Sequence, residues 1–282
     1  MSTTKNYGGL PKDYSGKNSP IVILPVPYDA TSTWIKGADK GPGAIIEASA
    51  NMELYDIDTD TSVCEKGIFT DAPVKESSSP ESMVAAVKRR VENHLKNDKF
   101  VVVIGGEHSV SLGAIQAHKD LHNNISVLQF DAHSDLRQEY RGSIYNHACV
   151  MARAKELCPI VQVGIRSMDA EEIEFMDRNN VFFAKDIHDK RDWIQHVLPL
   201  LKDKVYITID LDVFDPSVMP STGTPEPGGL LWYDVLSLLK EVIEKKQVIG
   251  FDIVELCPNI HNKAPDFLAA KLIYAILSYR FR

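Results

Sequence analysis

Residues 100–135 read FVVVIGGEHSVSLGAIQAHKDLHNNISVLQFDAHSD. Two short apolar runs rich in β-branched and aromatic residues, Phe100–Ile104 and Ile125–Phe130, enclose a segment with helical periodicity, Val110–Leu121. Runs that are apolar at successive positions are typical of strands buried on both faces, as in a parallel sheet. The stretch therefore predicts a strand, a helix and a second strand in succession.

The same alternation extends through the rest of the chain. Strands alternating with helices favour a mostly parallel sheet covered by helices on both faces, which is an α/β fold. No long linker or internal repeat interrupts the pattern, so we expect one domain, residues 1–282, with a polar N-terminal leader over residues 1–19. The further strands are expected at Pro20–Pro27, Ile160–Val163, Val205–Ile209 and Val248–Val254, and the further helices at Ser82–Lys96, Ala170–Asn179, Trp193–Leu201, Leu231–Lys245 and Ala264–Tyr279.

The composition of the chain indicates which classes of ligand and which cellular compartment to expect. The formal net charge of -8 provides no basic surface for nucleic acid or an anionic membrane, and it favours a cationic or neutral ligand. No run of 18 or more apolar residues occurs, and the N-terminus lacks an apolar signal segment. The four cysteines show neither CxxC spacing nor the density of a secreted scaffold, so we expect reduced thiols in a cytoplasmic protein.

Polar residues directly after the predicted strands are the candidates for a site, because open parallel sheets bind ligands beyond the carboxyl ends of their strands. The run Phe100–Ile104 leads into Gly105-Gly106-Glu107-His108, where two glycines permit a tight turn before His108. A single histidine in this position is more often a hydrogen-bonded structural residue than a ligand. His108 therefore indicates a site only in combination with other residues.

Two more strands end in alternating acidic residues. One is followed by Asp131, His133 and Asp135, and the other ends in Asp210 and Asp212. Alternate residues of an extended chain point to one face, so each set is expected to converge on one point. Capping of a turn is an alternative explanation for Asp135, but it requires only one acidic residue.

Four aspartates in one pocket would repel one another strongly unless cations neutralised them. Two divalent ions would balance four carboxylates. Oxygen donors with two imidazoles and no thiolate favour manganese, with Mg²⁺, Fe²⁺ and Zn²⁺ as alternatives. We therefore expect two Mn²⁺ per subunit, and a water shared by such a pair would supply hydroxide as a nucleophile near neutral pH.

Two residues outside these clusters complete the expected site. His147 follows the first aspartate cluster by a loop, where a neutral imidazole can pass a proton to a leaving amine. Glu255 follows a predicted strand and can make paired hydrogen bonds to a planar guanidinium. A loop histidine without a chemical role and a salt bridge at a strand end remain the alternatives for these two residues.

Three segments together resemble the signature segments of the arginase/ureohydrolase family and occur in the family's order. They are GGEHS at residues 105–109, DAHSD at residues 131–135 and DLDVFDP at residues 210–216. The resemblance extends to GADKGPGAI at residues 37–45 and GTPEPGGL at residues 223–230, and so covers most of the chain. It implies a three-layer α/β/α domain around a mostly parallel eight-stranded sheet, assembled as a homo-oligomer, either a trimer or a hexamer.

The resemblance also assigns a role to each candidate residue. His147 corresponds to the family's proton-shuttling histidine and Glu255 to its guanidinium-binding glutamate, and Asp131 is grouped with them as catalytic because it would bridge the metals. The implied metal ligands are His108 and Asp135 for one manganese, His133 and Asp212 for the other, and Asp131 and Asp210 for both.

The segment around His147-Ala148-Cys149 and the GTPEPGG run look like the agmatinase branch of the family. The resemblance thus implies hydrolysis of the small cationic guanidino compound agmatine to urea and putrescine by a metal-bridging hydroxide. Other guanidino or formimino hydrolases, such as a guanidinobutyrase, guanidinase, arginase or formimidoylglutamase, would share the same metal ligands. A catalytically silent binding protein would be expected to lack ligands, and a binuclear phosphoesterase would need a phosphate-binding Arg or Lys that is not evident beside these segments.

Overall fold

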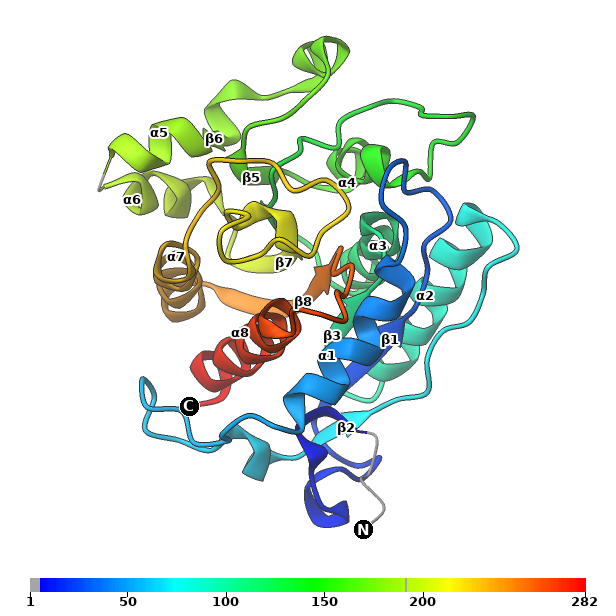
Figure 1. The fold of residues 1–282 in the computed structure, drawn as a ribbon, viewed down its shortest axis with the longest axis vertical. Helices are drawn as coiled ribbons and strands as arrows, with labels where there is room; N and C mark the ends of the chain where they lie inside the picture. The colour runs from blue at the N-terminus through cyan, green and yellow to red at the C-terminus, as the bar shows by residue number, and fades with distance from the viewer. Residues whose placement is uncertain (1–5, 191) are drawn as a thin grey trace.

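The computed structural model describes residues 6–190 and 192–282 (Figure 1). Within these residues eight strands form one sheet in the order β2-β1-β3-β8-β7-β4-β5-β6. Every pair of neighbouring strands is parallel, which confirms the predicted fold class. The strands are β1 (Ile21–Val26), β2 (Ile68–Thr70), β3 (Phe100–Gly105), β4 (Ile125–Phe130), β5 (Ile160–Ile165), β6 (Val181–Phe183), β7 (Lys204–Asp210) and β8 (Gln247–Val254).

Helices cover both faces of the sheet (Figure 1). One core contains side chains of α1, α6, α7 and α8, and the other contains side chains of α2, α3 and α4. Alternate residues of β3 supply the two cores, since Val102 and Ile104 belong to the first and Val101 and Val103 to the second. The helices are α1 (Gly41–Ser49), α2 (Pro80–Leu95), α3 (Ser111–Leu121), α4 (Val150–Leu157), α5 (Ala184–Asp189), α6 (Trp193–Val197), α7 (Trp232–Lys245) and α8 (Ala264–Phe281).

The six longer strands lie where the apolar runs predicted them, but the two shortest were not predicted. Strands β2 and β6 contain three residues each and lie at opposite edges of the sheet. A run of three residues is too short to show a hydrophobic pattern. Helices α1, α4 and α5 were also missed, and each has nine residues or fewer.

One predicted helix was wrong in type. The segment Ala170–Asn179 forms two 3₁₀ turns, Ala170–Phe175 and Arg178–Asn180, in place of an α-helix. A capping box between Asp169 and Glu172 begins the first turn, and Asp177 begins the second by accepting a hydrogen bond from the backbone of Asn179. The second acidic cap interrupts the helical hydrogen-bond series, so the segment remains in short turns.

The N-terminal segment packs against the domain as far as it is described. Tyr7 is fully buried, and its hydroxyl donates a hydrogen bond of 2.7 Å to the carbonyl of Ala270 in α8. Leu10 is also buried in the first core. Residues 1–5 of the expected leader lie outside the described residues. In the part of the chain that the structure covers, none of the helices combines the length and apolar character needed to cross a membrane.

Candidate active site

The four central strands of the sheet end beside one another and bring the predicted site residues together. Strands β3, β8, β7 and β4 are consecutive neighbours, and being parallel they end at the same edge of the sheet. A cavity opens at this edge. Its lining includes His108 after β3, Asp135 after β4, Asp210 at the end of β7 and Glu255 after β8.

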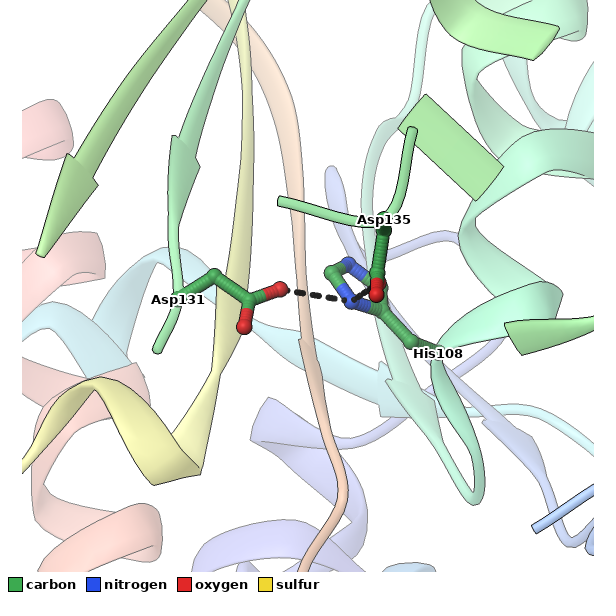
Figure 2. Close-up of side chains that lie close together, drawn as sticks. All are labelled: His108, Asp131 and Asp135. Carbon is green, nitrogen blue, oxygen red and sulfur yellow. Dashed lines mark ion pairs between the residues drawn. The ribbon is translucent and has the colours of Figure 1, made fainter. Parts of the chain in front are cut away.

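The first group of potential metal ligands surrounds His108. Its Nδ1 lies 3.0 Å from Asp131 Oδ2 and 3.0 Å from Asp135 Oδ2. Figure 2 shows both carboxylates pointing at this one nitrogen. Nδ1 is buried, yet it makes no hydrogen bond to any described residue. Three ligand atoms thus face a common point, which is the arrangement that a metal ion requires.

The other ring nitrogen of His108 indicates why Nδ1 is available as a ligand. Nε2 lies 2.9 Å from Thr208 Oγ1, and that hydroxyl donates to Asp252 Oδ1 at 2.6 Å. Because the only hydroxyl hydrogen goes to the carboxylate, Nε2 must carry the hydrogen that it shares with Thr208. Nδ1 then carries a lone pair in the neutral ring, as ligation of a metal requires.

The second group shares Asp131 with the first. It consists of Asp131, His133 and Asp212. His133 Nδ1 lies 2.8 Å from Asp212 Oδ2 and 3.6 Å from Asp131 Oδ1. Asp210 contacts both groups, since its Oδ2 lies 3.5 Å from His108 Nδ1 and its Oδ1 accepts a hydrogen bond from the amide of Asp212. The two groups overlap at one carboxylate, which is suited to two neighbouring ions.

Backbone amides hold these carboxylates in place. The amide of His133 donates to Asp131 Oδ1 at 2.6 Å, and that of Ala132 donates to Asp212 Oδ1 at 2.9 Å. The amide of Asp212 donates to Asp210 Oδ1 at 2.8 Å. Asp135 has a φ of 52°, in the left-handed region that few residues other than glycine adopt. The loops are therefore built to hold acidic side chains in one orientation.

The electrostatics of the site require cations. Burial raises the pKa of Asp135 to about 7, and the charge of Asp131 adds to this. Burial and the charges of Asp212 and Asp131 also raise the pKa of Asp210 well above its ordinary value. Burial acts in the same direction on Asp131, but its contacts with His108 and His133 hold its pKa well below the ordinary range. Four clustered aspartates and two imidazoles therefore fit a binuclear metal centre, whose charge would allow all four carboxylates to ionise.

Glu255 and His147 lie on the wall of the same cavity. Glu255 has a φ of 67°, and its Oε1 accepts a hydrogen bond of 2.7 Å from the amide of His108. Burial, followed by the charge of Glu107, raises the pKa of Glu255 well above its ordinary value. Burial lowers the pKa of His147 to about 4, so its ring is neutral at pH 7.

All eight residues predicted from the sequence thus lie together. Seven line the cavity, and the fully buried Asp131 lies behind them, close to both His108 and His133. Sequence reasoning gave no role to Thr208, Asp252, Thr31 or Glu107. Their positions depend on contacts between residues more than 40 positions apart, and no local pattern reveals such contacts.

Comparison with known proteins places the chain in a family. Residues 19–278 match the sequence model of the Arginase family. The chain belongs to the arginase family. It is therefore an enzyme of the ureohydrolase type, a hydrolase that acts on guanidino C–N bonds. The family depends on a binuclear metal centre, and this ureohydrolase has His and Asp groups able to hold metal.

Individual relatives of this ureohydrolase differ in the substrate that their names give. It is 40% identical over 270 residues to the N(1)-aminopropylagmatine ureohydrolase of Synechocystis sp., covering 92% of this chain and 88% of that protein. It is 33% identical over 273 residues to the agmatinase of Pyrococcus horikoshii, covering 94% of each. Among solved structures, the agmatine ureohydrolase of Thermoplasma volcanium is similar, with a TM-score of 0.86, 33% identity and coverage of 95% of this chain and 92% of that one.

Proposed function

We propose that this ureohydrolase uses two manganese ions to release urea from a linear, agmatine-type amine. The two overlapping ligand groups that share Asp131 are the observation that carries the proposal. We propose the ligand assignment that the family resemblance implies, with His108 and Asp135 on one ion, His133 and Asp212 on the other, and Asp131 and Asp210 on both. When bound, two such ions would supply a water that ionises near neutral pH.

Glu255 is proposed to bind the guanidinium group. Its carboxylate lies on the cavity wall, and the amide of His108 holds it by one oxygen at 2.7 Å. A carboxylate can face two N–H groups of a planar guanidinium at once, which fixes both the position and the plane of the substrate. The guanidinium carbon, at which the C–N bond breaks, would thus be held in the cavity beside the candidate metal ligands.

His147 is proposed to transfer the proton that the leaving amine needs. When the C–N bond breaks, the amine nitrogen takes up a proton that the attacking water has lost. His147 lines the cavity, and its low pKa leaves the ring neutral and able to accept that proton before passing it on. The imidazole is restored to its starting state at the end of the cycle.

The tail of the substrate is either that of agmatine or a longer one. Hydrolysis of agmatine gives urea and putrescine, and hydrolysis of its N(1)-aminopropyl derivative gives urea and spermidine. The 40% identity to an N(1)-aminopropylagmatine ureohydrolase, against 33% to an agmatinase, favours the longer tail. Trp34 supports this choice, because it lines the cavity with 69% of its surface exposed and offers apolar area to an aliphatic chain.

Urea release from a substrate panel tests the proposal. The Mn²⁺-loaded protein is assayed with N(1)-aminopropylagmatine, agmatine, arginine and 4-guanidinobutyrate, with Asp131→Ala as the inactive control. We expect the largest kcat/KM for N(1)-aminopropylagmatine and the second largest for agmatine. A preference for a substrate with a carboxylate tail would overturn the proposed substrate class, and absence of urea from all four would overturn the activity.

A further inference from the structure

Glu107 is a buried carboxylate that the proposed chemistry does not use. It precedes His108 in the chain and has no exposed surface. Its side chain contacts the loop that begins at Thr31. Oε1 accepts hydrogen bonds from the hydroxyls of Thr31 and Ser109, both at 2.6 Å, and Oε2 accepts from the amides of Thr31 at 2.5 Å and Ser32 at 3.2 Å. Four donors surround one carboxylate.

Thr31 connects this carboxylate to His147. The amide of His147 donates to Thr31 Oγ1 at 3.0 Å, and Nδ1 of the same residue also lies 3.0 Å from that oxygen. The hydroxyl of Thr31 therefore has three partners, namely Glu107 Oε1, the amide of His147 and Nδ1 of His147. A hydroxyl has one hydrogen to donate and two lone pairs that accept.

The direction of each of these hydrogen bonds follows from the set of partners. The contact to Glu107 at 2.6 Å has the length of a hydroxyl donating to a carboxylate, so the only hydrogen of Thr31 points to Glu107. Thr31 Oγ1 then accepts from both groups of His147. Nδ1 satisfies this arrangement only if it carries a hydrogen, and Nε2 of the neutral ring is then left with a lone pair.

We propose that Glu107 and Thr31 are positioning residues that hold His147 in the Nδ1–H tautomer. The proposal rests on the proposed function of His147 as a proton carrier. Nδ1 is engaged by Thr31, and none of the described residues makes a hydrogen bond to Nε2, so Nε2 is the nitrogen left for the cavity that His147 lines. Nε2 accepts the proton lost by the attacking water and gives it to the amine nitrogen as the C–N bond breaks. The ring needs no tautomer exchange between the two steps.

The same carboxylate also fixes the loop at the cavity. The amides of Thr31 and Ser32 both donate to Glu107, and residues 32–35 line the cavity. One buried group thus positions both the proton carrier and part of the wall that the substrate contacts. A purely structural role would fix the loop without affecting which nitrogen of His147 is protonated, and this difference makes the proposal testable.

The test compares Thr31→Val, which removes the hydroxyl at nearly constant shape, with Thr31→Ser, which keeps it. Histidine labelled with ¹⁵N is incorporated, the protein is loaded with Mg²⁺ as a diamagnetic ion, and His147 is assigned by the signal lost in His147→Asn. We expect the Nδ1–H pattern in the wild type and in Thr31→Ser, and a shift toward the Nε2–H tautomer in Thr31→Val. Circular dichroism verifies that each variant is folded.

Kinetics with Mn²⁺ provide the second measurement. We expect Thr31→Val to lower kcat about tenfold or more with a much smaller change in KM, and Thr31→Ser to recover most of kcat. An Nε2–H tautomer in the wild type, or an unchanged tautomer in folded Thr31→Val, would overturn the proposal. The NMR result does not depend on a substrate, so it still decides the tautomer if no guanidino compound is hydrolysed.

Discussion

Asp131 belongs to both groups of potential metal ligands, and its substitution should affect both ions. Its Oδ2 lies 3.0 Å from His108 Nδ1, and its Oδ1 lies 3.6 Å from His133 Nδ1. Asp135 contacts only the first of these histidines among the ion pairs of the site. The two aspartates follow the same strand and are both buried, so they form a matched pair for mutagenesis.

We predict that the wild-type protein retains about two Mn²⁺ per chain after dialysis, Asp135→Asn about one and Asp131→Asn almost none. The physical reason is that Asp131 belongs to both groups, whereas Asp135 belongs to one. Metal analysis by mass spectrometry measures the stoichiometry directly. Equal losses in both variants would contradict the assignment of Asp131 as the shared ligand.

His147 should affect the rate of reaction more than the binding of substrate. We predict that His147→Asn lowers kcat by about 10²-fold or more, with KM changed only a few-fold, because a proton carrier acts in the transition state. Steady-state kinetics with saturating Mn²⁺ separate the two constants. A large rise in KM at unchanged kcat would assign His147 to substrate binding instead.

His118, which is not one of the candidate metal ligands, should make a pH-dependent contribution to the free energy of unfolding. It is fully buried, and burial lowers its pKa from 6.5 to about 4. The unfolded chain therefore binds more protons between these values, so the contribution is complete above pH 6.5 and is lost as the pH falls toward 4. We predict a loss of about 3 kcal/mol over this range. Urea unfolding at several pH values should show a shallower pH dependence in His118→Gln, and an equal slope would refute the prediction.

At the scale of elements, the turn after β3 depends on a close approach between two segments. A Cβ at Gly106 would lie 2.0 Å from the carbonyl oxygen of Tyr28. The amide of Gly106 donates to Val26, and its carbonyl accepts from the amide of Glu255 at 2.7 Å. Gly106 thus joins β1, β3 and the end of β8 immediately beside the site.

We predict that Gly106→Ala lowers the free energy of unfolding by about 3 kcal/mol and weakens metal binding, because backbone atoms must move apart. Gly43→Ala is the matched control. Gly43 lies in α1, where an added Cβ would have no heavy atom within 4 Å apart from its chain neighbours and the nearby backbone of its own helix, so alanine should be neutral or stabilise the helix by up to about 1 kcal/mol. Chemical denaturation and Mn²⁺ titration provide both measurements. An unchanged free energy of unfolding in Gly106→Ala would contradict the prediction, because it would mean that the backbone of Tyr28 can move away from residue 106 at little cost.

The strands and helices that could be predicted well are those long enough to show a hydrophobic pattern within their own sequence. Strand β4 was predicted at its observed bounds, Ile125–Phe130, and α8 begins at the predicted Ala264. That the candidate ligands lie together could be predicted for a similar reason, since they follow such strands at alternating positions. The short edge strands and the pairing of Thr31 with Glu107 depend on neighbours distant in sequence, and a single chain gives no local signal for them.

For the whole molecule, the N-terminal segment and the last helix hold each other in place. Tyr7 is buried against α8 and hydrogen-bonded to Ala270, although the two residues are 263 positions apart. Its amide also donates to Thr70 Oγ1 at the end of β2. The beginning of the chain thus contacts both the sheet edge and the C-terminal helix.

We predict that Tyr7→Ala lowers the free energy of unfolding by about 3 kcal/mol through the loss of buried area and of one hydrogen bond. Tyr14→Ala is the control, because Tyr14 is 40% exposed in the same segment and its loss should change stability by less than about 0.5 kcal/mol. Thermal and urea unfolding measure the change in the free energy of unfolding for each variant. Equal effects would mean that the segment contributes no specific packing.

The shortness of β2 and β6 has a consequence for the behaviour of the protein in concentrated solution. These two strands end the sheet, and each has three residues. An edge so short presents few unpaired amide and carbonyl groups to a strand from another molecule. The long, apolar strands that would most readily form fibrils are enclosed in the middle of the sheet. The short edge strands of this fold therefore disfavour aggregation by edge-to-edge pairing of sheets.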